Sequence, residues 1–126
     1  VDENKIVMLD GSGLSRANLV TAEATLQLLV HMSRHRYGTV YLDAQPVAGV
    51  DGTLRNRMKG TAAERNARAK TGTLGTATSL SGYVTSAAGE RLVFSLMINN
   101  PPREIRAPQA FTDPITVLLA SFGGRS

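Results

Sequence analysis

The tetrapeptide Lys70-Thr71-Gly72-Thr73 combines residue types that can bind an anionic ligand and stabilise developing negative charge. The Lys70 amine supplies positive charge for a ligand carboxylate and for proton transfer, and the Thr71 and Thr73 hydroxyls can bind that carboxylate. Gly72 would leave a strand edge open, so that a ligand backbone could pair alongside it. The backbone N–H of Thr73, the residue after Gly72, can point at a developing oxyanion. By itself the tetrapeptide is better explained by a solvated lysine at the end of a strand. The strand, hairpin and helix predicted around it, together with other sequence blocks of the chain, make Lys70 the candidate catalytic residue and Thr71, Gly72 and Thr73 the candidate substrate-binding residues.

Two serines near the start of the chain are the next candidates for chemistry. Ser12 lies in Asp10-Gly11-Ser12-Gly13, which does not have the Gly-x-Ser-x-Gly spacing of a hydrolase nucleophile. Aspartate, serine and glycine are typical turn residues, and their side chains commonly hydrogen-bond nearby backbone. We therefore expect Ser12 and Ser15 to stabilise a tight turn rather than to act as nucleophiles.

His31 and His35 are four residues apart, a spacing that on a helix suits two ligands of one metal ion. No glutamate lies between them, as it would on a zinc-peptidase helix, and the sequence contains only these 2 histidines. Two histidines are too few to form a zinc site. We therefore expect both side chains to lie in solvent on the side of a helix, and we predict no metal site.

The composition excludes several other classes of function. Of the 126 residues, 42% are hydrophobic and 19% charged, as in a globular chain, and no apolar run is long enough to span a membrane. No cysteine is present, so disulfides and thiolate ligands are excluded. The net charge of +4 comes from dispersed basic residues that are not interleaved with aromatic ones, which argues against nucleic-acid binding.

The elements that must position the tetrapeptide follow from hydrophobic periodicity. A helix is predicted over 21–36, with Thr21 as its N-cap and Gly38 beyond its end. Its expected buried stripe is Ala22, Leu26, Leu29 and Val30. The segment 43–68 is rich in glycine and proline and predicts irregular structure with at most a helical turn.

The second half of the chain predicts a β-hairpin followed by a helix. Strands are expected over 77–85 and 91–98, joined by a loop at 86–90, with Lys70–Thr73 on a strand beside them. Asp113 is predicted to cap a helix that begins at Pro114. The expected stripe of that helix is Ile115, Leu118, Leu119 and Phe122, and its expected end is Gly123-Gly124. Together these elements predict an α+β fold.

Four sequence blocks occur in an order that resembles one family. They are Asp10-Gly11-Ser12-Gly13-Leu14-Ser15, the segment 46–54, Ala69-Lys70-Thr71-Gly72-Thr73, and Leu80-Ser81-Gly82-Tyr83-Val84-Thr85. This order is similar to that of the class C low-molecular-mass penicillin-binding proteins, which are D-alanyl-D-alanine carboxypeptidases and endopeptidases of the bacterial cell wall. Lys-Thr-Gly is also a known motif of serine enzymes that bind penicillin. The resemblance covers nearly the whole chain.

The resemblance implies a β-lactamase/transpeptidase-like fold, with antiparallel strands and flanking helices. It implies that Lys70 orients the substrate carboxylate, that Thr71 and Thr73 contact it, and that the Thr73 N–H forms half of the oxyanion hole. No metal or organic cofactor is implied. The implied partners are a peptidoglycan peptide ending in D-Ala-D-Ala and β-lactams, and the implied location is the periplasm or the extracellular cell surface.

The family's other two motifs, Ser-x-x-Lys and Ser-x-Asn, are not found in the 126 residues. We therefore expect 1–126 to be the C-terminal segment of the penicillin-binding domain, without the portion that bears the nucleophile, and to be inactive alone. Its expected partner is that N-terminal portion or a second copy. The alternative is a non-catalytic module that binds cell-wall peptide or a protein through an open sheet edge.

Overall fold

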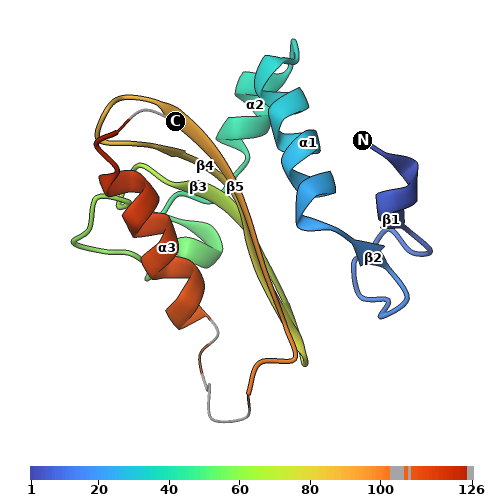
Figure 1. The fold of residues 1–126 in the computed structure, drawn as a ribbon. Helices are drawn as coiled ribbons and strands as arrows, with labels where there is room; N and C mark the ends of the chain where they lie inside the picture. Colours follow the sequence, from blue (N-terminus) through green and yellow to red (C-terminus); the bar gives the residue numbers. More distant parts are fainter. Residues whose placement is uncertain (103–106, 108, 125–126) are drawn as a thin grey trace.

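A three-stranded antiparallel sheet is the centre of the fold (Figure 1). The computed structural model describes residues 1–102, 107 and 109–124. The strands are β3 (Arg68–Leu74), β4 (Ala77–Thr85) and β5 (Arg91–Asn99), in that spatial order. Helix α1 (Ala22–Arg34) lies on one side of the sheet and helix α3 (Gln109–Ser121) on the other. This α+β arrangement agrees with the prediction.

The pairing register decides which side chains share a face of the sheet. Thr71 is paired with Leu80, and the neighbouring pair joins Lys70 to Ser81. The face that includes Leu80 and Phe94 is packed in the core together with Ala120 of α3. The opposite face includes Lys70, Ser81 and Tyr83, and there the Tyr83 hydroxyl donates a 2.7 Å hydrogen bond to the Leu29 carbonyl of α1. Burial raises the pKa of Tyr83.

The predicted hairpin is confirmed. Strand β4 has the predicted bounds, and β5 is one residue longer than the predicted 91–98. The intervening loop is closed by a 2.8 Å hydrogen bond from the Ser86 N–H to the Glu90 carbonyl, and Gly89 supplies a φ of 82°. A positive φ of this kind favours glycine, which is why the loop could be found in the sequence.

Helix α1 begins where the sequence predicts, because the Thr21 hydroxyl accepts a 3.1 Å hydrogen bond from the Ala24 N–H. It ends two residues early, at Arg34. The prediction of Gly38 as a stop was wrong, since Gly38 begins a further short helix, α2 (Gly38–Asp43). A Cβ at Gly38 would lie 2.5 Å from the Met32 carbonyl oxygen, so glycine allows the close approach at this corner.

Helix α3 differs from its prediction in both its start and its buried face. It begins at Gln109, so Asp113 is not its N-cap and Pro114 lies inside it. The Asp113 carboxylate instead accepts hydrogen bonds from the Arg57 guanidinium, at 3.1 Å between Nε and Oδ2. Most of the predicted stripe was also wrong: Ile115, Leu118 and Phe122 are exposed, and Leu119 alone among its four members packs against the core. The buried residues of α3 are small or β-branched: Thr112, Thr116 and Ala120.

The segment between α2 and β3 is irregular, as predicted, apart from the single turn η2 (Gly52–Leu54). It nevertheless supplies half of the buried core cluster, whose members from this segment are Ala48, Leu54, Met58, Ala63 and Ala67. At the N-terminus, the turn η1 (Glu3–Lys5) leads into β1 (Ile6–Val7), which pairs with β2 (Leu19–Val20).

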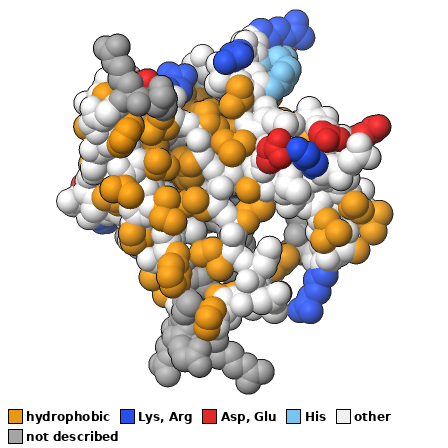
Figure 2. All heavy atoms as spheres, in the orientation of Figure 1, with side chains coloured by type: hydrophobic (Ala, Val, Ile, Leu, Met, Phe, Trp, Pro, Cys, Tyr) orange, Lys and Arg blue, Asp and Glu red, His pale blue; other side chains and the backbone are white. Residues whose placement is uncertain are grey.

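Large apolar side chains are exposed at several places on the surface, and two groups of them are prominent. Figure 2 shows them as orange groups over α3 and at the N-terminal β1–β2 hairpin. On the hairpin they are Val7, Met8, Leu9, Leu14, Leu19 and Val20, and on α3 they are Phe111, Ile115 and Leu118. No helix in the described part of the chain is long and apolar enough to cross a membrane.

Candidate active site

Strand β3 presents the Lys70–Thr73 tetrapeptide at an edge of the sheet. Before this point the outer edge is occupied, because the Ala69 N–H donates a 3.0 Å hydrogen bond to the Pro46 carbonyl. Within the described residues, no strand pairs with this edge beyond Ala69. Backbone groups of an antiparallel strand alternate between its two edges, so the N–H and C=O groups of Thr71 and Thr73 face the open side.

The Lys70 side chain is exposed, and its Nζ donates a 2.5 Å hydrogen bond to the Thr71 carbonyl oxygen. Thr71 is half-buried, and its Oγ1 donates a 2.9 Å hydrogen bond to Oγ1 of Thr53. Thr73 is exposed. The predicted residues are therefore together on one strand edge, with an amine, hydroxyls and backbone N–H groups available to a ligand.

At Gly72 the absence of a side chain matters for space rather than for backbone conformation. A Cβ at this position would lie 2.5 Å from Oγ of Ser79 on the neighbouring strand. The Gly72 carbonyl accepts a 3.2 Å hydrogen bond from the Thr78 hydroxyl, which ties the motif to β4. The missing side chain thus allows β3 and β4 to pair closely beside the candidate site.

The Asp10 carboxylate organises the loop that contains Ser12 and Ser15. It accepts hydrogen bonds from the Ser12 N–H at 2.9 Å, the Ser12 hydroxyl at 2.8 Å and the Ser15 N–H at 3.1 Å. The Ser12 backbone N–H is the main reason that the pKa of Asp10 is lowered. The predicted turn role of both serines is confirmed.

The structure does not bring these serines to Lys70. Their loop joins β1 to β2, and Figure 1 shows that hairpin beyond α1, away from α3. In the described part of the chain, no hydrogen bond links the loop to β3. Neither serine is therefore placed to be activated by the lysine.

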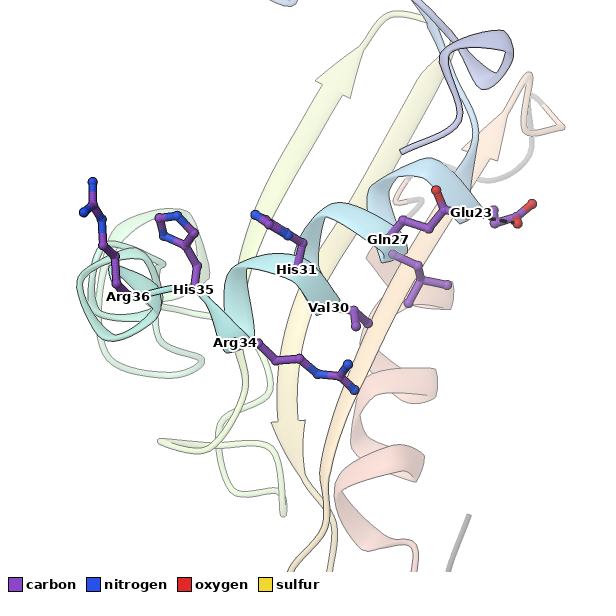
Figure 3. A pocket seen from close by; sticks show the side chains of 8 residues that line it. Glu23, Gln27, Val30, His31, Arg34, His35 and Arg36 are labelled. Carbon is purple, nitrogen blue, oxygen red and sulfur yellow. Dashed lines mark hydrogen bonds between the residues drawn. The ribbon is translucent and has the colours of Figure 1, made fainter.

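His31 lies on the exposed side of α1, whereas His35 is the half-buried C-cap residue just beyond its end, with the two ring centroids 5.5 Å apart (Figure 3). The Nδ1 atom of His35 accepts a 3.2 Å hydrogen bond from the Tyr37 N–H. Among the described residues there is no group of three or more potential metal ligands. The open hollow in Figure 3 is lined by residues of α1 and its C-terminal end, and none of the four predicted site residues contributes to it.

Sequence reasoning missed Thr53 as a neighbour of the motif. Thr53 belongs to η2, eighteen residues before Thr71, and its hydroxyl contacts the motif directly. Thr53 lies in the block 46–54 on which the family resemblance partly rests, so its position in that block was the available signal.

An antiparallel sheet with a helix on each face and Lys-Thr-Gly at its open edge is the arrangement expected of a transpeptidase-like fold. A family model described as the D-Ala-D-Ala carboxypeptidase 3 (S13) family matches residues 1–122. The chain belongs to this family.

Individual relatives agree with this assignment. The chain is 45% identical over 129 residues to a D-alanyl-D-alanine carboxypeptidase of Actinomadura sp. (strain R39), covering 98% of this chain and 23% of that protein. It is 37% identical over 95 residues to the D-alanyl-D-alanine carboxypeptidase DacB of Haemophilus influenzae, covering 74% of this chain and 20% of that protein. The chain therefore spans less than a quarter of the length of either relative.

Solved structures show the same fold. The crystal structure of penicillin binding protein 4 (dacB) from Haemophilus influenzae superposes with a TM-score of 0.74 at 32% identity, covering 91% of this chain and 26% of that one. The same protein complexed with a novel β-lactam gives a TM-score of 0.76 at 32% identity, covering 90% of this chain and 28% of that one. The predicted fold class is confirmed.

Proposed function

We propose that this chain supplies the Lys-Thr-Gly strand of a serine-type D-Ala-D-Ala carboxypeptidase/endopeptidase that acts on peptidoglycan peptides and is acylated by β-lactams. One observation carries the proposal: the open edge of β3 presents Lys70, Thr71, Gly72 and Thr73 together. Membership of the S13 family supports it.

In the whole enzyme, a serine would attack the peptide bond of the terminal D-Ala-D-Ala, release D-alanine, and form an acyl-enzyme that water hydrolyses. This covalent route divides one difficult step into two easier ones. Lys70 would orient the substrate carboxylate, and the hydroxyls of Thr71 and Thr73 would bind it. The Thr73 N–H faces the open edge by strand alternation and would donate one of the two oxyanion hydrogen bonds.

We infer that the nucleophile comes from a different part of the enzyme, because the 126 residues contain no Ser-x-x-Lys motif. We assign 1–126 to the C-terminal segment of the penicillin-binding domain, with the N-terminal portion of the same enzyme as its partner. The substrate would be a peptidoglycan peptide ending in D-Ala-D-Ala. Such a substrate places the enzyme in the periplasm or at the extracellular cell surface.

The test is covalent labelling by a fluorescent penicillin, followed by intact mass. We expect the full-length enzyme to form an adduct and the 126-residue chain alone to form none, because it lacks the nucleophile motif. Adding the upstream portion in trans should restore labelling. An adduct on Ser12 or Ser15 of the isolated chain would overturn the proposal. A full-length protein that binds the peptides without turnover or labelling would indicate a binding module instead.

A further inference from the structure

Thr53 is a polar residue beside the motif to which neither the sequence blocks nor the proposed mechanism gives a role. Its Oγ1 lies 2.9 Å from Oγ1 of Thr71, and the two residues come from different elements, η2 and β3. Thr53 is exposed and Thr71 is half-buried, so a ligand at the edge of β3 could reach both hydroxyls.

The segment that carries Thr53 is held firmly against β3. Leu54 is completely buried, and its carbonyl accepts a 3.0 Å hydrogen bond from the Gly49 N–H. The Asp51 carboxylate accepts a 2.8 Å hydrogen bond from the Val47 N–H and closes the turn. Two further backbone bonds attach this segment to β3 and to the residue before it: the Ala69 N–H donates to the Pro46 carbonyl at 3.0 Å, and the Ala48 N–H donates to the Ala67 carbonyl at 2.9 Å. The Thr53 position is therefore preorganised.

The hydrogen-bond capacity of the pair shows what it can offer a ligand. Each threonine hydroxyl has one proton to donate and two lone pairs to accept with. In the structure Thr71 donates its proton to Thr53, and the Thr53 proton is not used in this bond. Because a hydroxyl proton can rotate about the C–O bond, a bound carboxylate can accept the protons of both hydroxyls in place of the bond between them. A carboxylate only accepts hydrogen bonds, and the nearby Lys70 ammonium favours a negative charge at this edge.

We propose that Thr53 is a substrate-binding residue whose hydroxyl, held against Thr71, completes a two-hydroxyl donor site for the terminal carboxylate of the substrate. The inference rests on the proposed function, because it takes the carboxylate of a D-Ala-D-Ala peptide or a β-lactam as the ligand. It adds a residue outside the Lys-Thr-Gly strand to the site and names the ligand group that this residue contacts.

The experiment uses the full-length enzyme and two thioester substrates that are identical except that one ends in a free carboxylate and the other in its methyl ester. Thr53→Val removes the hydroxyl and keeps the shape of the side chain. We expect it to lower kcat/KM about tenfold for the carboxylate substrate, as is typical of a lost hydrogen bond to a charged group. The loss should be less than about twofold for the ester, because that group carries no charge to stabilise.

Three further variants separate binding from structural effects. Thr53→Ser retains the hydroxyl and should restore most of the activity lost in Thr53→Val. The double variant Thr53→Val/Thr71→Val should lose less than the product of the two single losses, because the two hydroxyls act as a unit. Thr39→Val is the matched control, since Thr39 is an exposed threonine of α2 and should have no effect.

Each remaining outcome counts against a specific claim. An active parent with unchanged kcat/KM in Thr53→Val would overturn the inference and leave the proposed function intact. An equal loss for the carboxylate and the ester would also overturn it, since that pattern indicates a structural effect. A folded parent that turns over neither substrate and is not labelled by penicillin would overturn the proposed function and this inference with it.

Discussion

The exposed Lys70 amine lies close to the candidate binding threonines and makes few bonds of its own. It lies on the edge strand next to the two threonines, and it bonds only to the Thr71 carbonyl oxygen through its Nζ in the described part of the chain. A lysine held by one backbone oxygen retains two protons for a ligand. The position therefore supplies positive charge to the open edge without the cost of breaking an ion pair.

Replacing Lys70 should affect chemistry more than folding. In the full-length enzyme, we expect Lys70→Ala to reduce the rate of acylation by a labelled β-lactam by about 10²–10³, by analogy with the loss of a preorganised oxyanion donor. The midpoint of thermal unfolding should change little, because the side chain is exposed. Lys59→Ala, also at an exposed lysine, is the control. Acylation of Lys70→Ala at the parental rate would show that the proposed role is wrong.

At the scale of elements, the pairing of β3 with β4 depends on two glycines that differ in what surrounds them. A Cβ at Gly82 would lie 2.1 Å from the Arg68 carbonyl oxygen and 2.7 Å from Cβ of Ala69. A Cβ at Gly72 would meet only the Ser79 side chain. A side chain can rotate away, whereas a backbone carbonyl within a sheet cannot move without breaking the ladder.

This difference predicts unequal effects of the two alanine substitutions. Gly82→Ala should destabilise the enzyme strongly, by about 2–3 kcal/mol or more, because it forces β3 away from β4. Gly72→Ala should cost less, and adding Ser79→Ala should recover much of that cost. Denaturant unfolding of the full-length variants measures both effects. Equal losses for the two glycines, or no recovery with Ser79→Ala, would contradict this account of the strand pairing.

The Arg57–Asp113 ion pair joins the irregular segment to α3. The Arg57 side chain is 20% exposed and the Asp113 side chain is 21% exposed. The Arg57 guanidinium also donates a 3.1 Å hydrogen bond to the Thr112 hydroxyl. The pair therefore adds a polar attachment to the apolar core that this segment shares with α3.

Removing one partner leaves the other charge partly buried without compensation. We expect Asp113→Ala to lower the free energy of unfolding by about 1–3 kcal/mol, as for hydrogen bonds to charged groups. The double variant Arg57→Ala/Asp113→Ala should be less destabilised than the sum of the singles. The exposed Lys5–Glu23 pair is the control, and Glu23→Ala should cost less than about 1 kcal/mol. Equal losses for the two pairs, by denaturant unfolding, would contradict the prediction.

At the scale of the whole molecule, apolar surface is exposed on both α3 and the N-terminal hairpin. Leu118 is 70% exposed and Leu9 is 71% exposed. Contiguous apolar surface usually marks an interface with another protein or another part of the same one. The proposed N-terminal portion of the enzyme is one partner that could cover this surface.

The 126-residue chain by itself should therefore self-associate. We expect its weight-average mass, measured by light scattering after gel filtration, to rise with concentration above the monomer value of 13.4 kDa. Leu118→Ser combined with Ile115→Ser should reduce the association, because it removes apolar surface from the exposed face of α3. A monomer at every concentration would contradict this prediction.

The sequence alone determined those features that depend on neighbouring residues. The hairpin followed from two β-rich runs and a short loop containing Gly89, and the start of α1 followed from the Thr21 cap. The turn role of Ser12 and Ser15 followed from the chemistry of Asp10 and the glycines around it. In each case the stabilising contact lies within a few residues along the chain, so a local pattern is sufficient to predict it.

Only the tertiary structure decided the features that depend on distant partners. The start of α3 could not be predicted from Asp113, because that carboxylate binds Arg57, 56 residues away. The buried face of α3 is formed by Thr112, Thr116 and Ala120 rather than by its largest apolar residues, because close packing on the sheet favours small side chains. Thr53 joined the candidate site only because its loop lies along β3, eighteen residues before its partner.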